Sequence, residues 1–411
     1  MAWVAGRYAI RSLRRNVRRS ILAIVGIAIG CSLALIMEGF NRGRDELFAR
    51  AGASSGAGHL RVVPAGWRLT RDSRLRLADW RADLDVVLSL PGVAAAAPRA
   101  RADGLLAMGT HVTAVEIVGV DPDREPPTDR FIRAMTAGRY LRAGDRGAIV
   151  LGQAIATRLA IGLDDDVLGS VVGRTGDIDS AMFRVVGLVQ TGSDDLDAMI
   201  CQVPLGDLEG LTGRSGAGEI AVVLRDWRAI DQTRAALVPA LAAPDDVMTW
   251  EELSPDFKGH MRQDQTASRA ITGIILLIVL LGVMSAELAA VLERRREFAV
   301  LSALGMSGWT MTRLVVLEAV ALGVAGGLGG LALGGPLVWR LARTGLDFGR
   351  WYGANFSVTG AFIEPVIYLD FGFWVLPYTL LVAIVATVAA SVYPAIFAAR
   401  TDPAVALRVA Q

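Results

Sequence analysis

The densest group of charged side chains in this sequence, Glu-Arg-Arg-Arg-Glu at residues 293–297, lies between two long apolar segments. Charged clusters in such a place either anchor a membrane protein at the lipid surface or dock a partner protein. Residues 298–305 follow as a short amphipathic helix, since Val300 and Leu304 are four positions apart and glycine and serine end the pattern. Anchoring or docking, rather than catalysis, is the chemistry that this pattern predicts.

Residues that carry out catalysis or hold metals are not arranged for either task in this sequence. A nucleotide-hydrolysing P-loop needs a lysine after a glycine-rich loop, and the only lysine, Lys258, lies in Asp-Phe-Lys-Gly-His. The three histidines and the two cysteines, Cys31 and Cys201, lack the close spacing of a zinc site. We therefore predict no catalytic residue and no metal site; a catalytic triad assembled only by the fold stays open.

Hydrophobic residues make up 53% of the 411 residues, and the net charge is +1. This composition is typical of a membrane protein, and the lack of a basic excess argues against a nucleic-acid partner. A membrane-spanning helix needs about 20 mostly apolar residues, and four segments qualify: 21–40, 270–292, 314–339 and 373–397. We interpret the first as a retained signal-anchor helix, with a cleaved signal peptide as the alternative.

Arginines flank these segments unevenly and so predict the topology, because positive residues favour the cytoplasmic side. Arginine-rich stretches precede the first span, lie between the second and third, and follow the fourth. The predicted organisation is a cytoplasmic N-terminal segment (1–20), an extracytoplasmic domain (41–269), a cytoplasmic segment (293–313), a short extracytoplasmic loop (340–372) and a cytoplasmic tail (398–411).

The long insert between the first two spans has the pattern of a mixed α+β domain. Alternating apolar runs predict strands at 59–63, 113–121, 183–189 and 219–224. Amphipathic stretches that begin at Asp79, Ala154 and Asp231 predict helices between them. The predicted fold class is a membrane α-helical protein with four transmembrane helices and a large α+β extracytoplasmic domain between helices 1 and 2.

Small and ionisable residues stand out within the spans. Gly326, Gly330 and Gly334 recur every four residues, so they share one helix face and let a neighbouring helix approach closely. Glu287 and Glu318 are costly at membrane depth, and because both lie near the cytoplasmic ends of their spans we expect them to reach arginines at the interface.

The cluster at residues 293–305 resembles the cytoplasmic coupling segment of the FtsX/MacB-like superfamily of ABC transporter permeases. The matching positions are Glu293, Arg294, Arg296, Glu297, Val300, Leu301, Ala303, Leu304 and Gly305. The final stretch, Tyr-Pro-Ala-Ile-Phe-Ala-Ala-Arg-Thr-Asp-Pro-Ala-Val-Ala-Leu-Arg at 393–408, is similar to the end of the same permeases. Within the superfamily, residues 191–211 look most like the lipoprotein-releasing (LolC/LolE-type) permease subunits.

The resemblance implies a transport subunit rather than an enzyme. ATP and Mg would be bound by a partner, a cytoplasmic ABC ATPase dimer, with no cofactor in this chain. Further implied partners are a second permease subunit, as homo- or heterodimer, membrane lipids and a periplasmic lipoprotein carrier. The location implied is the bacterial inner membrane, multi-pass, with the large domain in the periplasm.

The same resemblance assigns roles to residues. Glu297, Arg294 and Arg296, next to Glu293, would contact the ATPase, whereas Val300, Leu301 and Leu304 would pack the short helix that Gly305 ends. The outward halves of the first two spans would form the substrate path. A carrier-docking hairpin would lie just before Phe183, at Arg174, Gly176, Asp177 and Ile178.

Three functions remain open from the sequence, of which the last is a sensor or structural membrane protein that works without an ATPase. In the first, ATP hydrolysis drives extraction of lipoproteins or another lipidic cargo from the outer leaflet of the inner membrane. In the second, a mechanotransmission permease uses the same motion to drive an extracytoplasmic hydrolase or a tripartite efflux assembly.

Overall fold

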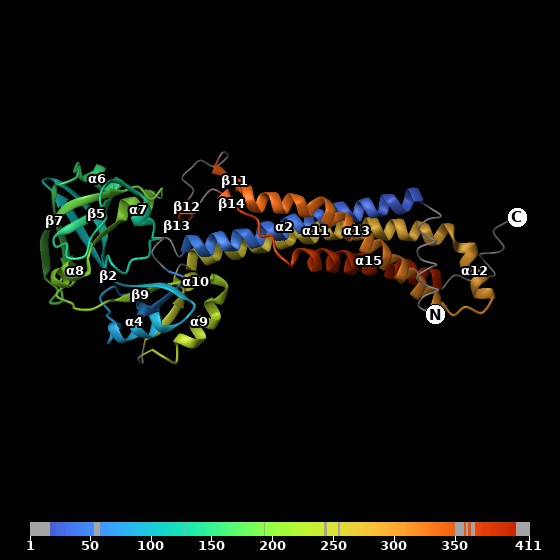
Figure 1. Ribbon diagram of the computed structural model, residues 1–411, viewed down its shortest axis with the longest axis horizontal. Helices are drawn as coiled ribbons and strands as arrows, with labels where there is room; N and C mark the ends of the chain where they lie inside the picture. The colour runs from blue at the N-terminus through green and yellow to red at the C-terminus, as the bar shows by residue number, and fades with distance from the viewer. Residues whose placement is uncertain are drawn as a thin grey trace. The chain divides into compact units, whose positions relative to one another are not determined.

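A computed structural model describes residues 17–399 except 53–57, 128, 193, 242–244, 254, 350–356, 359–360 and 363–365. The chain divides into two compact units (Figure 1). The helical unit comprises Met1–Arg44, Arg262–Leu346 and Ile367–Gln411, and the strand-rich unit comprises Asp45–Met261 and Asp347–Val366. Each unit is described by itself below.

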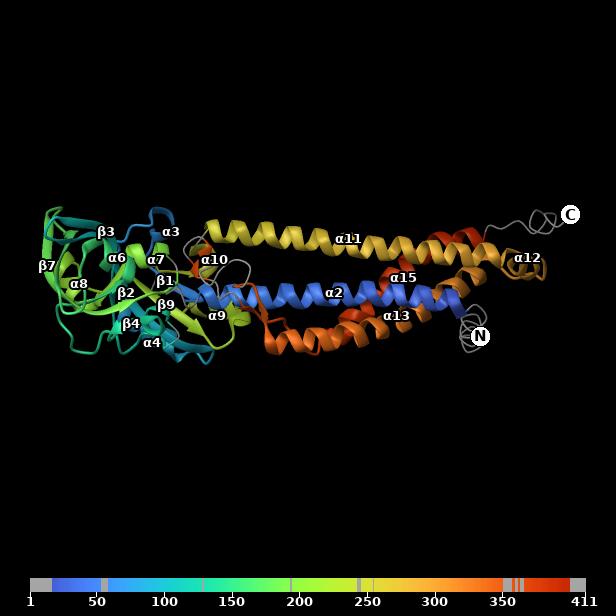
Figure 2. The ribbon, with the colours of Figure 1, turned by 90° about the horizontal axis from the view of Figure 1, so that it is seen from above.

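Four long helices, each with an apolar stretch long enough to cross a membrane, correspond to the predicted spans: α2 (Val17–Gly52), α11 (Pro255–Glu293), α13 (Gly308–Thr344) and α15 (Val375–Ala399). The helix α15 begins two residues after the predicted start of the fourth span at 373. A shorter helix, α12 (Arg295–Ala303), lies between α11 and α13 (Figure 2). The helices α2 and α11 continue past the predicted spans 21–40 and 270–292, because polar residues beyond the apolar stretch still favour a helix.

Glycines on α13 set the packing of the helical unit. A Cβ atom on Gly326 would lie 2.4 Å from Ile27 of α2, and one on Gly330 would lie 2.7 Å from Cys31. Gly334 faces Ser32 in the same way, at 2.9 Å. The three glycines singled out in the sequence therefore all lie against α2, whose backbone approaches α13 as small residues permit.

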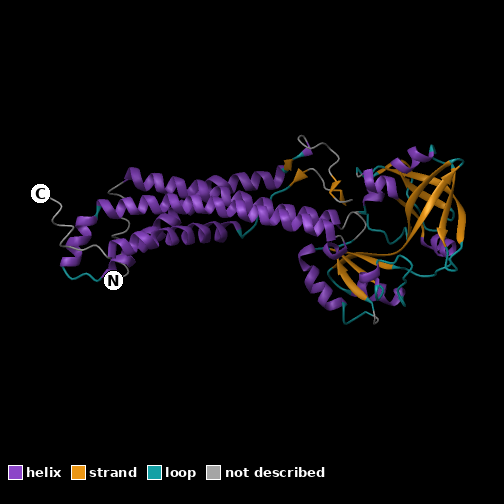
Figure 3. Cartoon of the chain, turned by 180° about the vertical axis from the view of Figure 1, so that it is seen from behind, coloured by secondary structure: helices purple, strands orange, loops and turns teal. Residues whose placement is uncertain are grey.

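The strand-rich unit is built on one mixed sheet (Figure 3). Its strands among the described residues are β1 (Leu60–Val63), β2 (Val93–Met108), β3 (His111–Val120), β4 (Met135–Gly138), β5 (Ala148–Gly152), β6 (Asp166–Val172), β7 (Ile178–Val189), β8 (Ile200–Pro204), β9 (Glu219–Leu224) and β10 (Asp246–Thr249). Six of them pair in a closed ring in the order β2, β3, β8, β5, β7 and β6. The remaining strands β9, β1 and β10 continue from the first half of β2, and β4 pairs with β7.

Helices cover this sheet and complete its cores. They are α3 (Trp67–Thr70), α4 (Trp80–Ser89), α5 (Arg130–Arg133), α6 (Gln153–Leu159), α7 (Asp194–Met199), α8 (Leu205–Thr212), η2 (Trp227–Ala229), α9 (Ile230–Leu237) and α10 (Trp250–Leu253). Aliphatic side chains of the strand ring, α6 and α8 form one core, and those of β1, β9, α4 and α9 form another. Between α13 and α15, the short strands β11 (Leu346–Asp347) and β14 (Val366–Ile367) pair, as do β12 (Ser357–Val358) and β13 (Ala361–Phe362).

The predicted fold class is confirmed. The four strand predictions correspond to β1, β3, β7 and β9, and the three helix predictions to α4, α6 and α9. The strand β2 was not predicted from the sequence. Its start, Val-Ala-Ala-Ala-Ala-Pro, has the composition of a helix, yet it pairs with β9 from Ala95 to Arg99.

Candidate functional site

One side of α12 is open and apolar at the end of the helix. Arg296, Val300 and Leu304 follow one another at four-residue intervals and therefore lie on one face. The side chain of Val300 is 48% exposed and that of Leu304 is 79% exposed. Gly305, with φ of +89°, reverses the chain after α12, and Trp309 beyond the turn is 70% exposed. The exposed face of Arg296, Val300 and Leu304, with the exposed Trp309 after the turn, is suited to a partner protein.

The other side of α12 packs within the chain. Phe298 and Ala299 are buried, and Phe298 joins Val315 of α13 and Ala395 of α15 in one apolar cluster. Leu301 packs against that cluster. Of the three residues expected to pack the short helix, Leu301 contacts this cluster, whereas Val300 and Leu304 lie exposed on the opposite face.

Arg294 is turned into the helical unit. Its guanidinium forms an ion pair with Glu318 of α13 at 3.0 Å and a longer one with Glu297 at 3.5 Å. The side chains of Arg294 and Glu318 are only 12% and 13% exposed. Of the four charged residues expected to serve the ATPase, Glu293 and Arg296 are exposed, Glu297 is partly exposed, and Arg294 is held against α13 instead.

The two acidic residues of the spans line the same small cavity. Glu287 of α11 is buried, and it shares this cavity with Glu318 of α13, whose other lining residues are Ser20, Ala23, Val283, Ala286 and Leu322. The expected contact of Glu318 with an interfacial arginine is present as its ion pair with Arg294. The ion pair and the cavity place polar groups within the ends of α11 and α13 that adjoin α12.

An apolar groove of about 520 Å³ lies between α2 and α11. Its lining is aliphatic apart from small residues, and comprises Leu22, Ala23, Gly26, Ile27, Ile29, Gly30, Leu33, Ile275, Ile278, Val279, Gly282, Val283 and Ala286. Apart from adjacent residues and the backbone of the same helix, no protein atom lies within 4 Å of where a Cβ on Gly26 or Gly282 would be, so these glycines keep the groove open.

The groove overlaps the predicted substrate path in part. Its lining includes Ile275, Ile278 and Val279 from the outward half of the second predicted span, whereas most of its α2 residues, between positions 22 and 30, belong to the inward half of the first. Farther along, the hydroxyl of Ser268 in α11 donates a hydrogen bond of 2.6 Å to Oδ1 of Asn41 in α2. This polar contact joins α2 and α11 just beyond the outer ends of the two predicted spans.

The hairpin predicted before Phe183 is formed by β6 and β7. Its turn closes with a hydrogen bond from the amide of Gly173 to the carbonyl of Asp177, and Gly176 occupies the left-handed region at φ of +93°. Arg174 and Ile178 are exposed, the latter by 75%. Met182, farther along β7, is also exposed, so the hairpin presents apolar side chains beside the charged turn.

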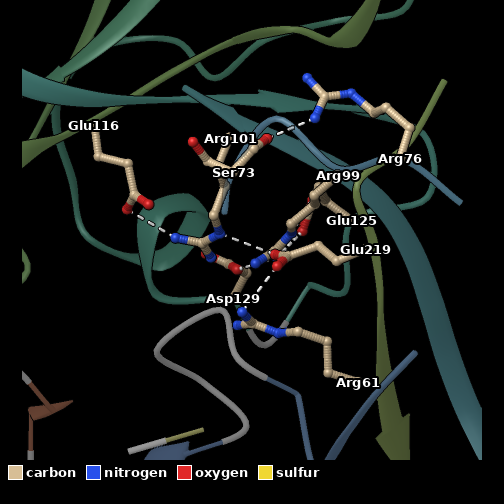
Figure 4. A network of polar contacts seen from close by, with 9 residues as sticks. All are labelled: Arg61, Ser73, Arg76, Arg99, Arg101, Glu116, Glu125, Asp129 and Glu219. Carbon is tan, nitrogen blue, oxygen red and sulfur yellow. Dashed lines mark hydrogen bonds and ion pairs between the residues drawn. The ribbon is translucent and has the colours of Figure 1, made fainter. Parts of the chain in front are cut away.

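A buried ionic network in the strand-rich unit was not foreseen from the sequence (Figure 4). Arg99 on β2 binds Glu125, with an Nε to Oε1 distance of 2.7 Å, and Asp129 at 2.8 Å. Arg101 binds Glu116 at 2.8 Å and Glu219 at 3.0 Å, and Glu219 also binds Arg61 at 2.8 Å. The network thereby links β1 and β9 to β2, β3 and the segment before α5.

The charges of this network shift the pKa values of its members. Burial alone would raise the pKa of Glu219, but the neighbouring Arg101 and Arg61 outweigh burial and hold it below the usual value. Burial raises the pKa of Glu125 despite Arg99, and burial lowers the pKa of Arg61 to about 10. The feature of the sequence that could have indicated this network is the pair of arginines at alternate positions 99 and 101 of one strand. Their partners lie 15 to 118 residues away.

Within the described ranges, no group of three or more His, Cys, Asp or Glu residues is placed to hold a metal ion. The buried charged side chains in Figure 4 form ion pairs with one another that link strands of the strand-rich unit. The features suited to transport are therefore the groove of the helical unit and the exposed face of α12.

Comparisons with known proteins agree with this organisation. Residues 20–240 match the family model of the MacB-like periplasmic core domain, and residues 269–403 match that of the FtsX-like permease C-terminal domain. Lipoprotein-releasing system transmembrane protein LolC of Xylella fastidiosa (strain 9a5c) is 25% identical over 419 residues, which cover 97% of this chain and 96% of that protein.

A second kind of relative is longer than this chain. Macrolide export ATP-binding/permease protein MacB of Hyphomonas neptunium is 28% identical over 358 residues, which cover 83% of this chain and 54% of that protein. The crystal structure of the periplasmic region of MacB from Actinobacillus actinomycetemcomitans aligns with 48% of this chain and 92% of its own, with 15% identity and a TM-score of 0.34.

Proposed function

This chain belongs to the family of ABC transporter permeases that carry a MacB-like periplasmic core domain and an FtsX-like permease domain, and we propose that it extracts lipoproteins or another lipidic cargo from the outer leaflet of the bacterial inner membrane. Permeases of this family work with a cytoplasmic ATPase. The name of its relative LolC, a lipoprotein-releasing protein that aligns over nearly the whole chain, supports the choice of cargo.

The observation that carries the proposal is the apolar groove between α2 and α11. Its volume of about 520 Å³ falls within the range of about 300–1,000 Å³ of pockets that bury a small molecule. An aliphatic lining suits acyl chains, because burying each methylene group contributes about 0.8 kcal/mol. Open glycines at 26 and 282 leave room for such a chain without rearrangement of the helices.

The energy for transport would come from the partner. In this proposal a separate ATPase dimer binds ATP and Mg and docks on the exposed face of α12, where Val300 and Leu304 offer apolar contact and Arg296 a charge. A second permease subunit completes the transporter, and the β6–β7 hairpin with its exposed Ile178 would receive a periplasmic carrier.

Filling the groove tests the proposal. Gly282→Leu and Gly26→Leu place a side chain in the open space, whereas Gly273→Leu is the matched control, because a Cβ at Gly273 meets no protein atom and this residue does not line the groove. A leucine that displaces two methylene groups of cargo, at about 0.8 kcal/mol each, lowers occupancy about tenfold.

The measurement is release of a fluorescent triacylated lipoprotein from nanodiscs that hold the permease and its ATPase. We expect both groove variants to slow release about tenfold, with Gly273→Leu and the retained amount of ATPase unchanged. Release at the wild-type rate by Gly282→Leu would contradict the proposal.

A second candidate, mechanotransmission, is favoured by the length of two helices. α2 has 36 residues and α11 has 39, well beyond the about 20 that a span requires, so each continues as one helix from the apolar stretch into residues of the strand-rich unit. A permease that only transmits motion would keep its ATP-driven activity when the groove is filled. The Gly282→Leu variant therefore distinguishes the two functions.

A further inference from the structure

Arg294 occupies the joint between two helices. α11 ends at Glu293 and α12 begins at Arg295, while backbone hydrogen bonds run from Arg294 to Ala290 and from Phe298 to Arg294 across the joint. Its guanidinium lies over the ring of Phe298, 5.4 Å from the centroid, and forms the 3.0 Å ion pair with Glu318. Arg294 therefore contacts both the buried side of α12 and the first turns of α13.

From Glu318, α13 continues to the wall of the groove. Its glycines at 326, 330 and 334 pack against Ile27, Cys31 and Ser32 of α2. The neighbouring α2 residues Gly26, Ile29, Gly30 and Leu33 line the groove toward α11. A continuous set of packed residues thus joins α12 to α2 through α13, beside the direct covalent route through α11.

We infer that Arg294 is a positioning residue, not an ATPase contact, and that its ion pair with Glu318 couples movement of α12 to α13 and so to the α2 wall of the groove. The inference rests on the proposed function only in placing the ATPase at α12. Both side chains are nearly buried at the edge of the membrane, where an uncompensated charge is unfavourable. A push on α12 therefore moves α13 with it rather than separating the pair.

Charge reversal with rescue tests this inference in the intact permease with its ATPase in nanodiscs. The variants are Arg294→Glu, Glu318→Arg and the double variant that restores the pair with opposite polarity, and Arg296→Glu is the control on the exposed face. One readout is the amount of ATPase that co-purifies. The other is the rate at which maleimide labels Gly282→Cys with and without ATP and vanadate. The native Cys31 and Cys201 are buried, so the introduced thiol reports on the groove.

We expect ATP to change the labelling rate of the otherwise wild-type protein about tenfold, a usual size for coupling between sites. Each single reversal should keep the ATPase bound and lose this change, and the double variant should regain it. Arg296→Glu should reduce the amount of ATPase that co-purifies, and combining it with Glu318→Arg should not restore that amount. If reversal prevents insertion, Arg294→Gln, Glu318→Gln and the neutral double variant replace the set, and the two single effects should then fail to add.

Three results would overturn the inference: loss of ATPase in Arg294→Glu to the same extent as in Arg296→Glu, no rescue in the double variant, or no ATP-dependent labelling in the wild-type background. Labelling requires no cargo. If lipoprotein release fails while labelling is lost and regained as described, the proposed cargo is wrong and the role of Arg294 stands.

Discussion

The helical unit and the strand-rich unit are held together by different kinds of contact. In the helical unit, glycines bring helix backbones together, as where Gly330 lies against Cys31 and the carbonyl of Ala28. In the described part of the strand-rich unit, large apolar side chains fill three cores, and the ion pairs of Arg61 and Arg101 join β1, β2, β3 and β9. In a membrane the apolar surroundings give little reason for apolar side chains to associate, so close backbone contact matters more there.

This difference bears on how each unit can move. Glycines bring α13 into direct contact with α2, so that in the coupling proposed above a shift of α13 carries the α2 wall of the groove with it. A hydrogen-bonded ionic network instead fixes the geometry of the groups that it joins. The membrane helices are therefore suited to changing the shape of the groove. The strand-rich unit is suited to transmitting motion without changing its own shape.

Arg99→Met should have the largest effect. It leaves Glu125 and Asp129 buried without their cation, and breaking a buried ion pair costs about 3–5 kcal/mol. We expect amide hydrogen exchange of β1, β2 and β9 in the intact permease to become faster to that extent, with no change in α13. The triple variant Arg99→Met, Glu125→Met, Asp129→Asn should recover most of the loss, since the side-chain amide introduced in place of the Asp129 carboxylate keeps an acceptor for the backbone N–H of Phe131. An equal loss in the single and triple variants would show that the packing of Arg99, not its charge, holds these strands.

Gly330→Ala should have a smaller but clear effect in the helical unit. The added Cβ would lie 2.7 Å from that of Cys31 and 3.0 Å from the carbonyl oxygen of Ala28, so the helices must separate. Overpacking of this kind costs about 1–3 kcal/mol and should lower the thermal midpoint of the permease in detergent. Gly273→Ala, where a Cβ meets open space, should be neutral or slightly stabilising because alanine favours a helix. Equal thermal midpoints for the two variants would show that close packing at Gly330 does not stabilise the helical unit.

The sequence predicted the helical unit better than the strand-rich unit, and local patterns explain why. A span is a local run of apolar residues, and Gly326, Gly330 and Gly334 are a local repeat, so neither depends on distant partners. The strand β2 begins with four alanines that favour a helix, and only pairing with Val222 and Val223 of β9 makes it a strand. Arg99 finds Glu125 and Asp129 26 and 30 residues away, which no spacing rule reveals.

The candidate site was predictable in place but not in orientation. The short helix after residue 293 follows from its periodicity, yet Val300 and Leu304 on one side and Phe298 and Leu301 on the other are equally apolar. Only contact with α13 and α15 decides which side is buried. Arg294 has the same sequence surroundings as Arg296, and only its ion pair with Glu318, 24 residues later, favours the positioning role proposed above over contact with the ATPase.

The smallest expected effect is a dependence of stability on pH, which we expect in the strand-rich unit and not in the glycine packing of the helical unit. Burial, and then the hydrogen bond and charge of Asp83, raise the pKa of Asp245 to about 6 from 3.8. A carboxyl whose pKa is raised on folding prefers its proton in the folded state. Its contribution to stability is therefore complete below about pH 4 and is lost as the pH rises through about 6.

Asp245→Asn keeps a hydrogen-bonding partner for Asp83 but cannot ionise. We expect it to raise the thermal midpoint of the permease at about pH 7.5 and to leave it unchanged near about pH 4. Asp85→Asn, which alters an exposed carboxylate on the same helix as Asp83, should show no such dependence, and neither should the destabilisation by Gly330→Ala. A pH-independent gain from Asp245→Asn would mean that the amide improves packing. The strand-rich unit would then differ from the helical unit in the distribution of its charges but not in its response to pH.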